Sequence, residues 1–467
     1  MSSSEVAASP ADTMDEAPAQ SANDRWAAGA SYAWLVLGLL ALTNVLSFMD
    51  RYLINIVAQP IKEDMGLTDA QVGLLTGFAT TLSYSVVGLP LARLAERVNR
   101  VWIIAGSVTV WSIMTAVSGR AANFVQLLLY RAGVGVGEAG AGPASQSLIA
   151  DYFPPDRRGT AFAIFSAAIP VGALIGAVTG GWIIDNWSWR EAFVYLGWPG
   201  VIVAAIFALL VKETPRGTFD ERQTDAAPPL LAVMRRLVRD PVSRHLVLGY
   251  TGVLLVTLAA GTFFAPFLAR KFAINYTTIG FVISLTTLGG GIVGNLLGGV
   301  LADRLSRRDR RWVAWVPAIG LSISVPFYFA SYLQPTVFLT AAVMLFPAII
   351  AMVFMAPTLS ALHARTDPRS RSTMIALVGL FASLFGGGLG PFLGGTVIDL
   401  LSEYFYAGSF ALDCMAGSTA PSAAADTSCA DALLQGTTLM LLGTAPLLLW
   451  PAAHYFRAAR HMKQVPA

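Results

Sequence analysis

Charged side chains are scarce in this chain of 467 residues. Asp, Glu, Lys and Arg together occupy only 13% of the positions, about half the fraction that is typical of soluble globular proteins. Hydrophobic residues occupy 55%, and the mean hydropathy is +0.61. A chain with so little charge has too few polar groups to cover a surface that faces water on all sides, which argues against an ordinary soluble enzyme.

Signals for a cofactor or for ATP are missing as well. The chain has four histidines without metal-ligand spacing and no P-loop. Residues 135–140 read GVGEAG and fit the dinucleotide fingerprint G-x-G-x-x-G, but that fingerprint requires a preceding strand in a soluble βαβ unit, and these residues lie in a hydrophobic run. The sequence therefore predicts no enzyme, no cofactor or metal, no use of ATP and no nucleic-acid partner.

The apolar residues are grouped into runs of about 18–25 residues, the length that a helix needs to cross a bilayer. We expect helices because an open sheet would leave backbone amides unpaired in lipid. The sequence thus predicts an all-α integral membrane protein with twelve transmembrane helices. The predicted spans cover about 33–57, 71–92, 101–119, 123–150, 160–184, 192–211, 245–269, 278–301, 312–333, 336–360, 373–399 and 433–456.

Two stretches are polar instead. Residues 1–30 are rich in Ser, Ala, Asp and Glu, and we expect a disordered cytoplasmic tail. Residues 213–243 contain four prolines and many charges, and within them Leu230–Arg239 fit a short amphipathic helix on the membrane surface. We interpret 213–243 as a cytoplasmic linker between a six-helix bundle at 31–212 and a second one at 244–460.

Lys and Arg are distributed unequally between the two sides of these spans. Of the 31 basic residues, 24 fall on one side and five on the other, while Arg51 and Arg131 lie within spans. The positive-inside rule then places both termini in the cytoplasm. We expect a multi-pass protein of the plasma (inner) membrane that functions as a monomer, with the lipid bilayer and a small amphiphilic substrate as its partners.

The only two cysteines, Cys414 and Cys429, lie in one loop, at about 402–432, which this topology places outside. Cysteines confined to an exported loop favour a disulfide. The alternative is a pair of unlinked loop thiols.

The two bundles repeat at particular residues. A set of glycines that ends in an aspartate occurs in the fifth span and again, 214 residues later, in the eleventh. Glycine at every fourth position makes a smooth helix face on which another helix can pack closely. The sets are Gly172, Gly176, Gly180, Gly181 and Asp185, and Gly386, Gly390, Gly394, Gly395 and Asp399.

Two short loops repeat as well: residues 94–100 read LAERVNR and residues 301–307 read LADRLSR. An acid followed by arginine at a helix end can form charged hydrogen bonds with neighbouring helix termini. We expect such residues to form a conformational latch that keeps one face of the bundle closed, although the positive-inside rule explains the arginines without a latch. The latch residues are Glu96, Arg97, Asp303 and Arg304.

These loops carry a family resemblance. Residues 299–308, with the pattern G-x-x-x-D-R-x-S-R-R, resemble the loop signature of the major facilitator superfamily, and residues 131–139, with R-x-x-x-G-x-G-x-A, resemble its fourth-helix motif. The first loop departs from the signature at Ala92 and Glu96, so its latch is expected to be weaker or differently bonded. The resemblance covers nearly everything after the tail and implies two pseudo-symmetric six-helix bundles that transport by alternating access.

A narrower resemblance points to the spinster-like branch of that superfamily. It is carried by GVGVGEA at 133–139 with Pro143, LIADYFP at 148–154, AIPVG at 168–172, and Asp50–Arg51. That branch is associated with export of lysophospholipids and sphingosine phosphates, so the resemblance implies a lysolipid-like substrate.

Four ionisable side chains lie well inside the predicted spans: Asp50, Arg51, Arg131 and Glu138. A charge at mid-membrane costs about 2.5–3.5 kcal/mol, so it rarely occurs without a partner or a function. Helical rise places Asp50 and Arg131 at nearly the same depth, where they can pair, with Glu138 deeper in the same cavity. Arg51 is expected to reach the outer surface instead.

From these charges we predict proton-linked gating by Asp50, Arg131 and Glu138. A carboxylate that pairs with arginine in one conformation and is desolvated in the other binds a proton differently in the two, so proton binding biases the conformations. The possible coupling ion is therefore H⁺. The alternative is a fixed ion pair that only sets the register of the helices.

The two halves differ in polarity, which would suit an amphiphile bound between them. Polar candidates for the cavity are Thr43, Asn44, Ser47 and Tyr84, and apolar candidates in the second half include Phe263, Phe267 and Phe354, although ordinary packing explains the apolar set equally well. We predict a secondary active transporter of a lysolipid-like substrate. The alternatives are a multidrug or small organic anion transporter, a uniporter driven by its substrate gradient, and a membrane receptor without transport.

Overall fold

The computed structural model of the chain describes residues 22–95, 97–216, 218–219, 230–366, 370–414 and 423–462. Every regular element in these ranges is a helix, which confirms the all-α fold class. Ten of the described helical segments are long and apolar enough to cross a membrane. Two more crossings bring the described number to twelve. They are the second, in which a π-helical turn interrupts the α-helix, and the fourth, which contains Arg131 and Glu138.

The N-terminal half contains the first six crossings. Its second crossing contains a π-helical turn, η1, and a short helix, α2, precedes it. In chain order the elements are α1 (Ala22–Ile56), α2 (Ala58–Met65), α3 (Asp69–Gly73), η1 (Leu74–Phe78), α4 (Ala79–Ala95), α5 (Arg100–Ser118), α6 (Phe124–Tyr152), α7 (Pro155–Asn186) and α8 (Trp189–Leu210).

The short helix α9 (Leu230–Arg239) precedes the C-terminal half. This half also contains π-helical turns, which lie in the eighth and eleventh crossings of the chain. Its elements are α10 (Pro241–Phe272), α11 (Tyr276–Leu288), η2 (Gly289–Gly294), α12 (Asn295–Ser306), α13 (Trp312–Tyr332), α14 (Val337–Ala351), η3 (Met352–Phe354), α15 (Met355–Arg365), α16 (Arg371–Phe381), η5 (Ala382–Leu389), α17 (Gly390–Phe405), α18 (Phe410–Asp413), α19 (Ala423–Leu447) and α20 (Leu449–His461).

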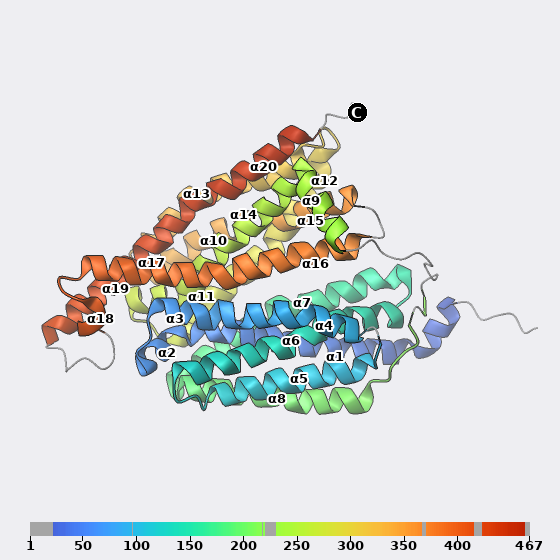
Figure 1. The fold of residues 1–467 in the computed structure, drawn as a ribbon, viewed down its shortest axis with the longest axis horizontal. Coiled ribbons are helices and arrows are strands. Elements are labelled where there is room, and N and C mark those ends of the chain that lie inside the picture. Colours follow the sequence, from blue (N-terminus) through green and yellow to red (C-terminus); the bar gives the residue numbers. More distant parts are fainter. Residues whose placement is uncertain are drawn as a thin grey trace, which may run out of the picture.

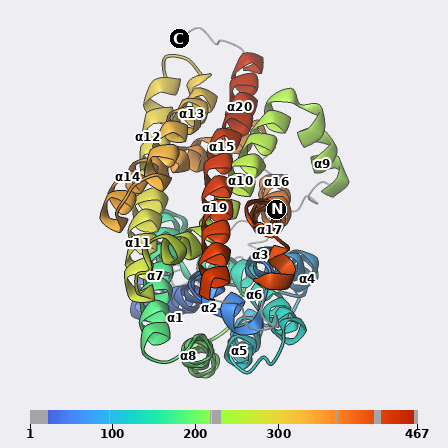
Figure 2. The same cartoon turned by 90° about the vertical axis from the view of Figure 1, so that its left-hand side faces the viewer.

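The two halves meet at one end of the molecule and diverge toward the other (Figure 1). Below, the outer end is the end at which α1 finishes and the inner end is the end at which α1 begins. Figure 2 looks onto the outer end, with the N-terminal half below the C-terminal half.

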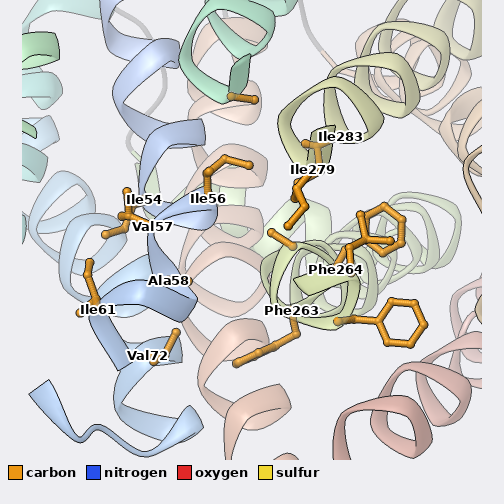
Figure 3. Close-up of a cluster of buried hydrophobic side chains, with 14 of the residues drawn as sticks. Ile54, Ile56, Val57, Ala58, Ile61, Val72, Phe263, Phe264, Ile279 and Ile283 are labelled. Atoms are coloured by element: carbon orange, nitrogen blue, oxygen red, sulfur yellow. The ribbon is translucent and has the colours of Figure 1, made fainter. Parts of the chain in front are cut away.

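The hydrophobic core follows this division. One buried cluster at the outer end takes residues from both halves, among them Ile54, Val57, Phe263 and Ile279 (Figure 3). The other two clusters each belong to one half. Because apolar burial joins the halves only at the outer end, the described structure is closed at the outer end and opens toward the inner end.

The repeated glycines bring helices into close contact. The first two of each set lie against the first crossing of their own half, α1 or α10. The last glycine of each set faces the other half: a Cβ on Gly181 would lie 2.3 Å from the carbonyl oxygen of Tyr276, and a Cβ on Gly395 would lie 2.0 Å from that of Asp69. Any larger side chain at either position would push the halves apart at the outer end.

Candidate transport site

The first buried ion pair joins α1 to α6. Arg131 Nη1 and Nη2 lie 3.0 and 2.9 Å from the two carboxylate oxygens of Asp50, and Thr115 Oγ1 of α5 donates to Asp50 Oδ1 over 2.7 Å. All three residues are at most 3% exposed. The bidentate geometry and the third hydrogen bond satisfy both carboxylate oxygens, so this pair fastens three helices together inside the N-terminal half.

The second buried acid has an arginine of its own. Arg51 donates from Nε to Glu138 Oε2 over 2.9 Å, its Nη2 lies 2.7 Å from the same oxygen, and Ser47 Oγ donates to Oε1 over 2.8 Å. The expectation that Arg51 reaches the outer surface is wrong. Because α1 and α6 run antiparallel, Glu138, two turns after Arg131, meets Arg51 and Ser47 on the turn of α1 that also carries Asp50.

The two pairs differ in their access to solvent. The Arg131 side chain is 1% exposed, whereas the Arg51 side chain is 41% exposed while its partner Glu138 is 1% exposed. The Arg51 guanidinium also lies over the rings of Phe48 and Tyr84, at 5.3 and 5.6 Å. Glu138 is thus a buried acid beside an accessible cation, and within the predicted proton-coupling set it is the acid whose arginine partner is exposed.

The four polar residues predicted for the cavity do not lie together in the structure. Ser47 and Tyr84 surround the Glu138–Arg51 pair, as described above. Asn44 Nδ2 donates to the Phe165 carbonyl of α7 over 2.9 Å. Thr43 is 2% exposed and donates to the Leu40 carbonyl of its own helix, so it takes part in helix packing and does not line an accessible surface.

The apolar candidates in the second half are core residues. Phe263 and Phe267 belong to the cluster that joins the halves, and neither is exposed. Phe354 is 1% exposed in the cluster of the C-terminal half. Of the two interpretations of this set, the structure supports ordinary packing, since apolar aromatic side chains are most stable in a packed core.

The two repeated aspartates connect the halves at the outer end. Asp399 of α17 accepts hydrogen bonds from the backbone N–H groups of Asp69 and Ala70, each 2.8 Å long, at the start of α3. Asp185 of α7 accepts from the N–H groups of Tyr276 and Thr277, also 2.8 Å each, at the start of α11. Each carboxylate caps the positive end of a helix in the other half. The same contact therefore occurs twice, related by the internal repeat.

Only one of these caps is reinforced by buried charges. Asp69 is fully buried; Arg270 Nη2 of α10 lies 2.7 Å from its Oδ1, and Lys62 of α2 binds its other oxygen. Arg270 also donates to Gln59 Oε1 over 2.9 Å. We call Lys62, Asp69, Arg270 and Asp399 the outer lock. Lys62, Asp69 and Arg270 belong to no repeat or motif in the sequence. The repeat that ends in Asp399 is the sequence signal that points to this end of the molecule.

A protein-family model described as "Major Facilitator Superfamily" matches residues 40–391. The chain belongs to the major facilitator superfamily. Among its relatives, an "MFS-type efflux pump" of Mycolicibacterium smegmatis is 31% identical over 379 residues, which cover 80% of this chain and 86% of the pump. "Protein spinster homolog 1" of Bos taurus is 30% identical over 399 residues, which cover 79% of this chain and 73% of that protein.

A solved structure carries the assignment to a branch. The crystal structure of "a bacterial homolog to human lysosomal transporter, Spinster", in an inward-facing and unoccupied conformation, has a TM-score of 0.80 and 31% identity, and the match covers 92% of this chain and 97% of that one. This transporter of the major facilitator superfamily is therefore spinster-like, an integral multi-pass membrane protein and not an enzyme.

The superfamily's loop residues lie at the inner end, where the halves are apart. Arg97, Asp303 and Arg304 are exposed, and they have no ion pair with any residue in the described ranges. Glu96 lies outside the described residues. The structure thus does not bring the candidate latch residues together, and their predicted role belongs to a conformation in which the inner ends meet.

The inner end of the N-terminal half contains a buried arginine that sequence reasoning missed. Arg100, 1% exposed, begins α5; it binds Asp151 of α6, and its Nε lies 2.6 Å from Glu213 Oε1. Glu213 Oε2 also accepts from the Arg100 backbone N–H over 2.7 Å. The start of the linker is thereby fixed to the start of α5. In the sequence Arg100 is the last residue of the repeated stretch 94–100, where its charge gives no sign of burial.

Three of the four histidines are brought together at the inner end of the C-terminal half. His245 Nδ1 of α10 lies 2.9 Å from His454 Nδ1 of α20, and the His461 ring stacks on His245 with ring centroids 6.0 Å apart. Within the described ranges, no group of three His, Cys, Asp or Glu residues is arranged to hold a metal ion.

The two cysteines are joined by a disulfide in the structure, with 5.6 Å between the Cα atoms of Cys414 and Cys429. The bridge connects the end of α18 to α19 at the outer end of the C-terminal half. In Figure 1, α18 extends beyond the rest of the bundle.

Proposed function

We propose that this transporter couples the movement of an amphiphilic, lysolipid-like anion to the movement of a proton by alternating access. The observation that carries the proposal is the contact between buried Glu138 and half-exposed Arg51. A carboxylate kept in this setting is ionised while the arginine faces it, and it becomes costly to keep ionised once the arginine turns away.

The coupling step follows from the charge of this pair. When Glu138 is ionised it neutralises Arg51; when Glu138 is protonated, the guanidinium is free to bind an anionic headgroup. The neighbouring rings of Phe48 and Tyr84 give an apolar surface beside that charge. Proton and anion would then bind together, and the Asp50–Arg131 pair would serve as the fixed anchor against which Arg51 moves.

The alternating-access part of the proposal rests on the two ends of the molecule. Both helix caps, Asp185 and Asp399, close the outer end in this conformation, while the inner loops with Asp303 and Arg304 are apart. In the opposite conformation the caps would break and the cytoplasmic loops would come together, with Arg97, Asp303, Arg304 and Glu96 as the latch. The proposal places the protein in the plasma (inner) membrane, with both termini on the cytoplasmic side.

The substrate class is supported by the charge of Arg51 and by the rings beside it. A single accessible arginine beside aromatic rings suits one anionic group on a largely apolar molecule. One relative is named an efflux pump, which supports export as the direction of transport. A hydrophobic drug is the alternative substrate.

The test is flux in proteoliposomes made from the purified protein, against a panel of lysophospholipids and hydrophobic drugs, with and without a pH gradient. The proposal expects uptake of a lysophospholipid that rises with the gradient and is lost in Glu138→Gln. Gradient-independent flux by both proteins would instead indicate a uniporter, and flux of drugs alone would replace the substrate class.

A further inference from the structure

Helix α9 lies between the two halves in the sequence. In the structure it packs against the C-terminal half by one face only. Val233 and Leu237, one turn apart, are 5% and 8% exposed in the cluster of that half. Its other faces leave Leu231 and Val238 exposed, at 68% and 57%. Figure 2 shows α9 at the edge of the C-terminal half, beside α10 and α16.

The exposed faces of α9 also carry three arginines. Arg235, Arg236 and Arg239 are all exposed, next to the unburied Leu231 and Val238. A helix that combines uncovered apolar side chains with several cations suits the bilayer interface, where the apolar groups enter the acyl region and the cations meet lipid phosphates. In water the same apolar side chains would remain uncovered.

A cavity of about 530 Å³ lies under this helix. It is bounded by α9, the start of α10, the end of α15 and the start of α16, and two guanidinium groups border it, those of Arg236 and Arg365. Ala232 of α9 lines the cavity one turn before Arg236. Hydroxyl groups of Ser243 and Thr366 add hydrogen-bonding capacity to the wall.

The one acid in the described wall is already neutralised. Asp240 accepts from Arg365 Nε and Nη2 over 2.9 and 2.8 Å, and from Ser243 N and Oγ over 3.0 and 2.6 Å. Although partial burial opposes ionisation, these hydrogen bonds lower the pKa of Asp240 well below its usual range. Arg236 has no carboxylate within ion-pair distance among the described residues. The described wall therefore has two arginines and one carboxylate, which leaves it with a net positive charge.

We propose that this cavity binds the phosphate of an anionic membrane phospholipid, with Arg236 as the main contact. A lipid fits better than a soluble anion because the apolar side chains that flank the cations are uncovered. The site is separate from the Glu138–Arg51 pair, so the inference does not depend on the proposed transport mechanism.

The test measures lipid bound to the purified full-length protein by native mass spectrometry in a non-ionic detergent. The probes are dioleoylphosphatidylglycerol, which is anionic, and dioleoylphosphatidylcholine, which is zwitterionic. Salt of about 0.5 M screens attraction between lipids and exposed charges in general. We expect one phosphatidylglycerol to remain bound, and Arg236→Gln to weaken its binding about tenfold, the loss of one charge-assisted contact.

Two further variants distinguish a site from diffuse attraction. Arg235→Gln removes the same charge from the same helix but does not border the cavity, and its affinity should stay within about twofold of the parent protein. Ala232→Phe fills the cavity without a change of charge and should lower the affinity as much as Arg236→Gln does. Because Asp240 stays ionised, binding should be the same between about pH 5 and pH 8.

Three results would overturn the proposal. Equal losses in Arg235→Gln and Arg236→Gln would show a diffuse basic surface without a site. Equal retention of phosphatidylcholine would remove the role of headgroup charge. Displacement of the lipid by millimolar inorganic phosphate, at unchanged protein stability, would identify a soluble anion as the occupant.

Discussion

Glu138 Oε2 lies 2.7 Å from Arg51 Nη2, although the two residues are 87 positions apart in the chain. The neighbouring residue Asp50 pairs with Arg131, which is two turns from Glu138 on the same helix. Two adjacent residues of α1 thus use two different partners on α6. One pair is sealed among three helices, and the other has an accessible arginine, so the two are expected to respond differently to substitution.

Glu138→Gln should reach the membrane at the normal level and lose transport, or at least its response to a pH gradient. The amide keeps the shape of the side chain and can still bond Ser47, but it can neither bind nor release a proton. Proteoliposome flux between about pH 5 and pH 8 is the measurement. Glu403→Gln, at an exposed outer position, is the matched control. Parental flux and pH dependence in Glu138→Gln would refute proton coupling at this residue.

Arg131→Ala should lower stability more than any single change at Glu138. It leaves Asp50 buried without its cation, which costs about 3–5 kcal/mol. The double variant Asp50→Asn/Arg131→Gln removes both charges and should recover part of that loss. Thermal unfolding in detergent compares the three proteins. Equal melting temperatures for the parent and Arg131→Ala would contradict the anchoring role of this pair.

Asp50→Asn separates anchoring from proton coupling. The sequence-based hypothesis expects it to lose the pH response as Glu138→Gln does, because both acids lie in the membrane. If the response persists in Asp50→Asn and is lost in Glu138→Gln, proton binding belongs to the accessible pair alone. Flux in the two variants at matched surface level decides between these outcomes.

Asp399→Ala should shift the population toward an outer-open conformation. It removes two hydrogen bonds to the start of α3, and loss of such a cap costs about 1–2 kcal/mol, a factor of about 5–30 in population. Spin labels at Ala122 and Leu333, which are exposed at the outer ends of the two halves, report the distance. Asp64→Asn is the control, because Asp64 pairs with Arg190 inside one half. Equal distance distributions in all three proteins would show that the cap does not close the outer end.

Asp303→Ala should favour the inward-open state by weakening the opposite one. Asp303 is exposed here, so the substitution leaves the described conformation intact and removes contacts only where the inner ends meet. Cysteine accessibility at the inner loops is the measurement, and Glu96→Ala, in the degenerate loop, should give a smaller shift. Unchanged accessibility would leave these residues as determinants of topology only.

Much of the fold could be predicted from the sequence because it depends on local quantities. The free energy of inserting each apolar run fixes the number and length of the crossings, and glycine spacing reveals which helix faces approach closely. The high cost of intramembrane charge singled out Asp50, Arg131 and Glu138, and helical rise put Asp50 opposite Arg131. Each of these properties depends on residues close together within one helix, so it can be predicted from the sequence alone.

Only the tertiary structure decided which charges meet and which end is closed. The partner of Arg51 depends on how α1 and α6 rotate about their axes, and the outer lock joins Asp69 to Arg270 across 201 positions and two halves. Neither pairing produces a periodic pattern in the sequence. In the proposed alternating-access cycle, the closed outer end is one of two packings of the same halves. Two such packings differ by about a few kcal/mol, and such a small difference arises from the sum of contacts over the whole interface.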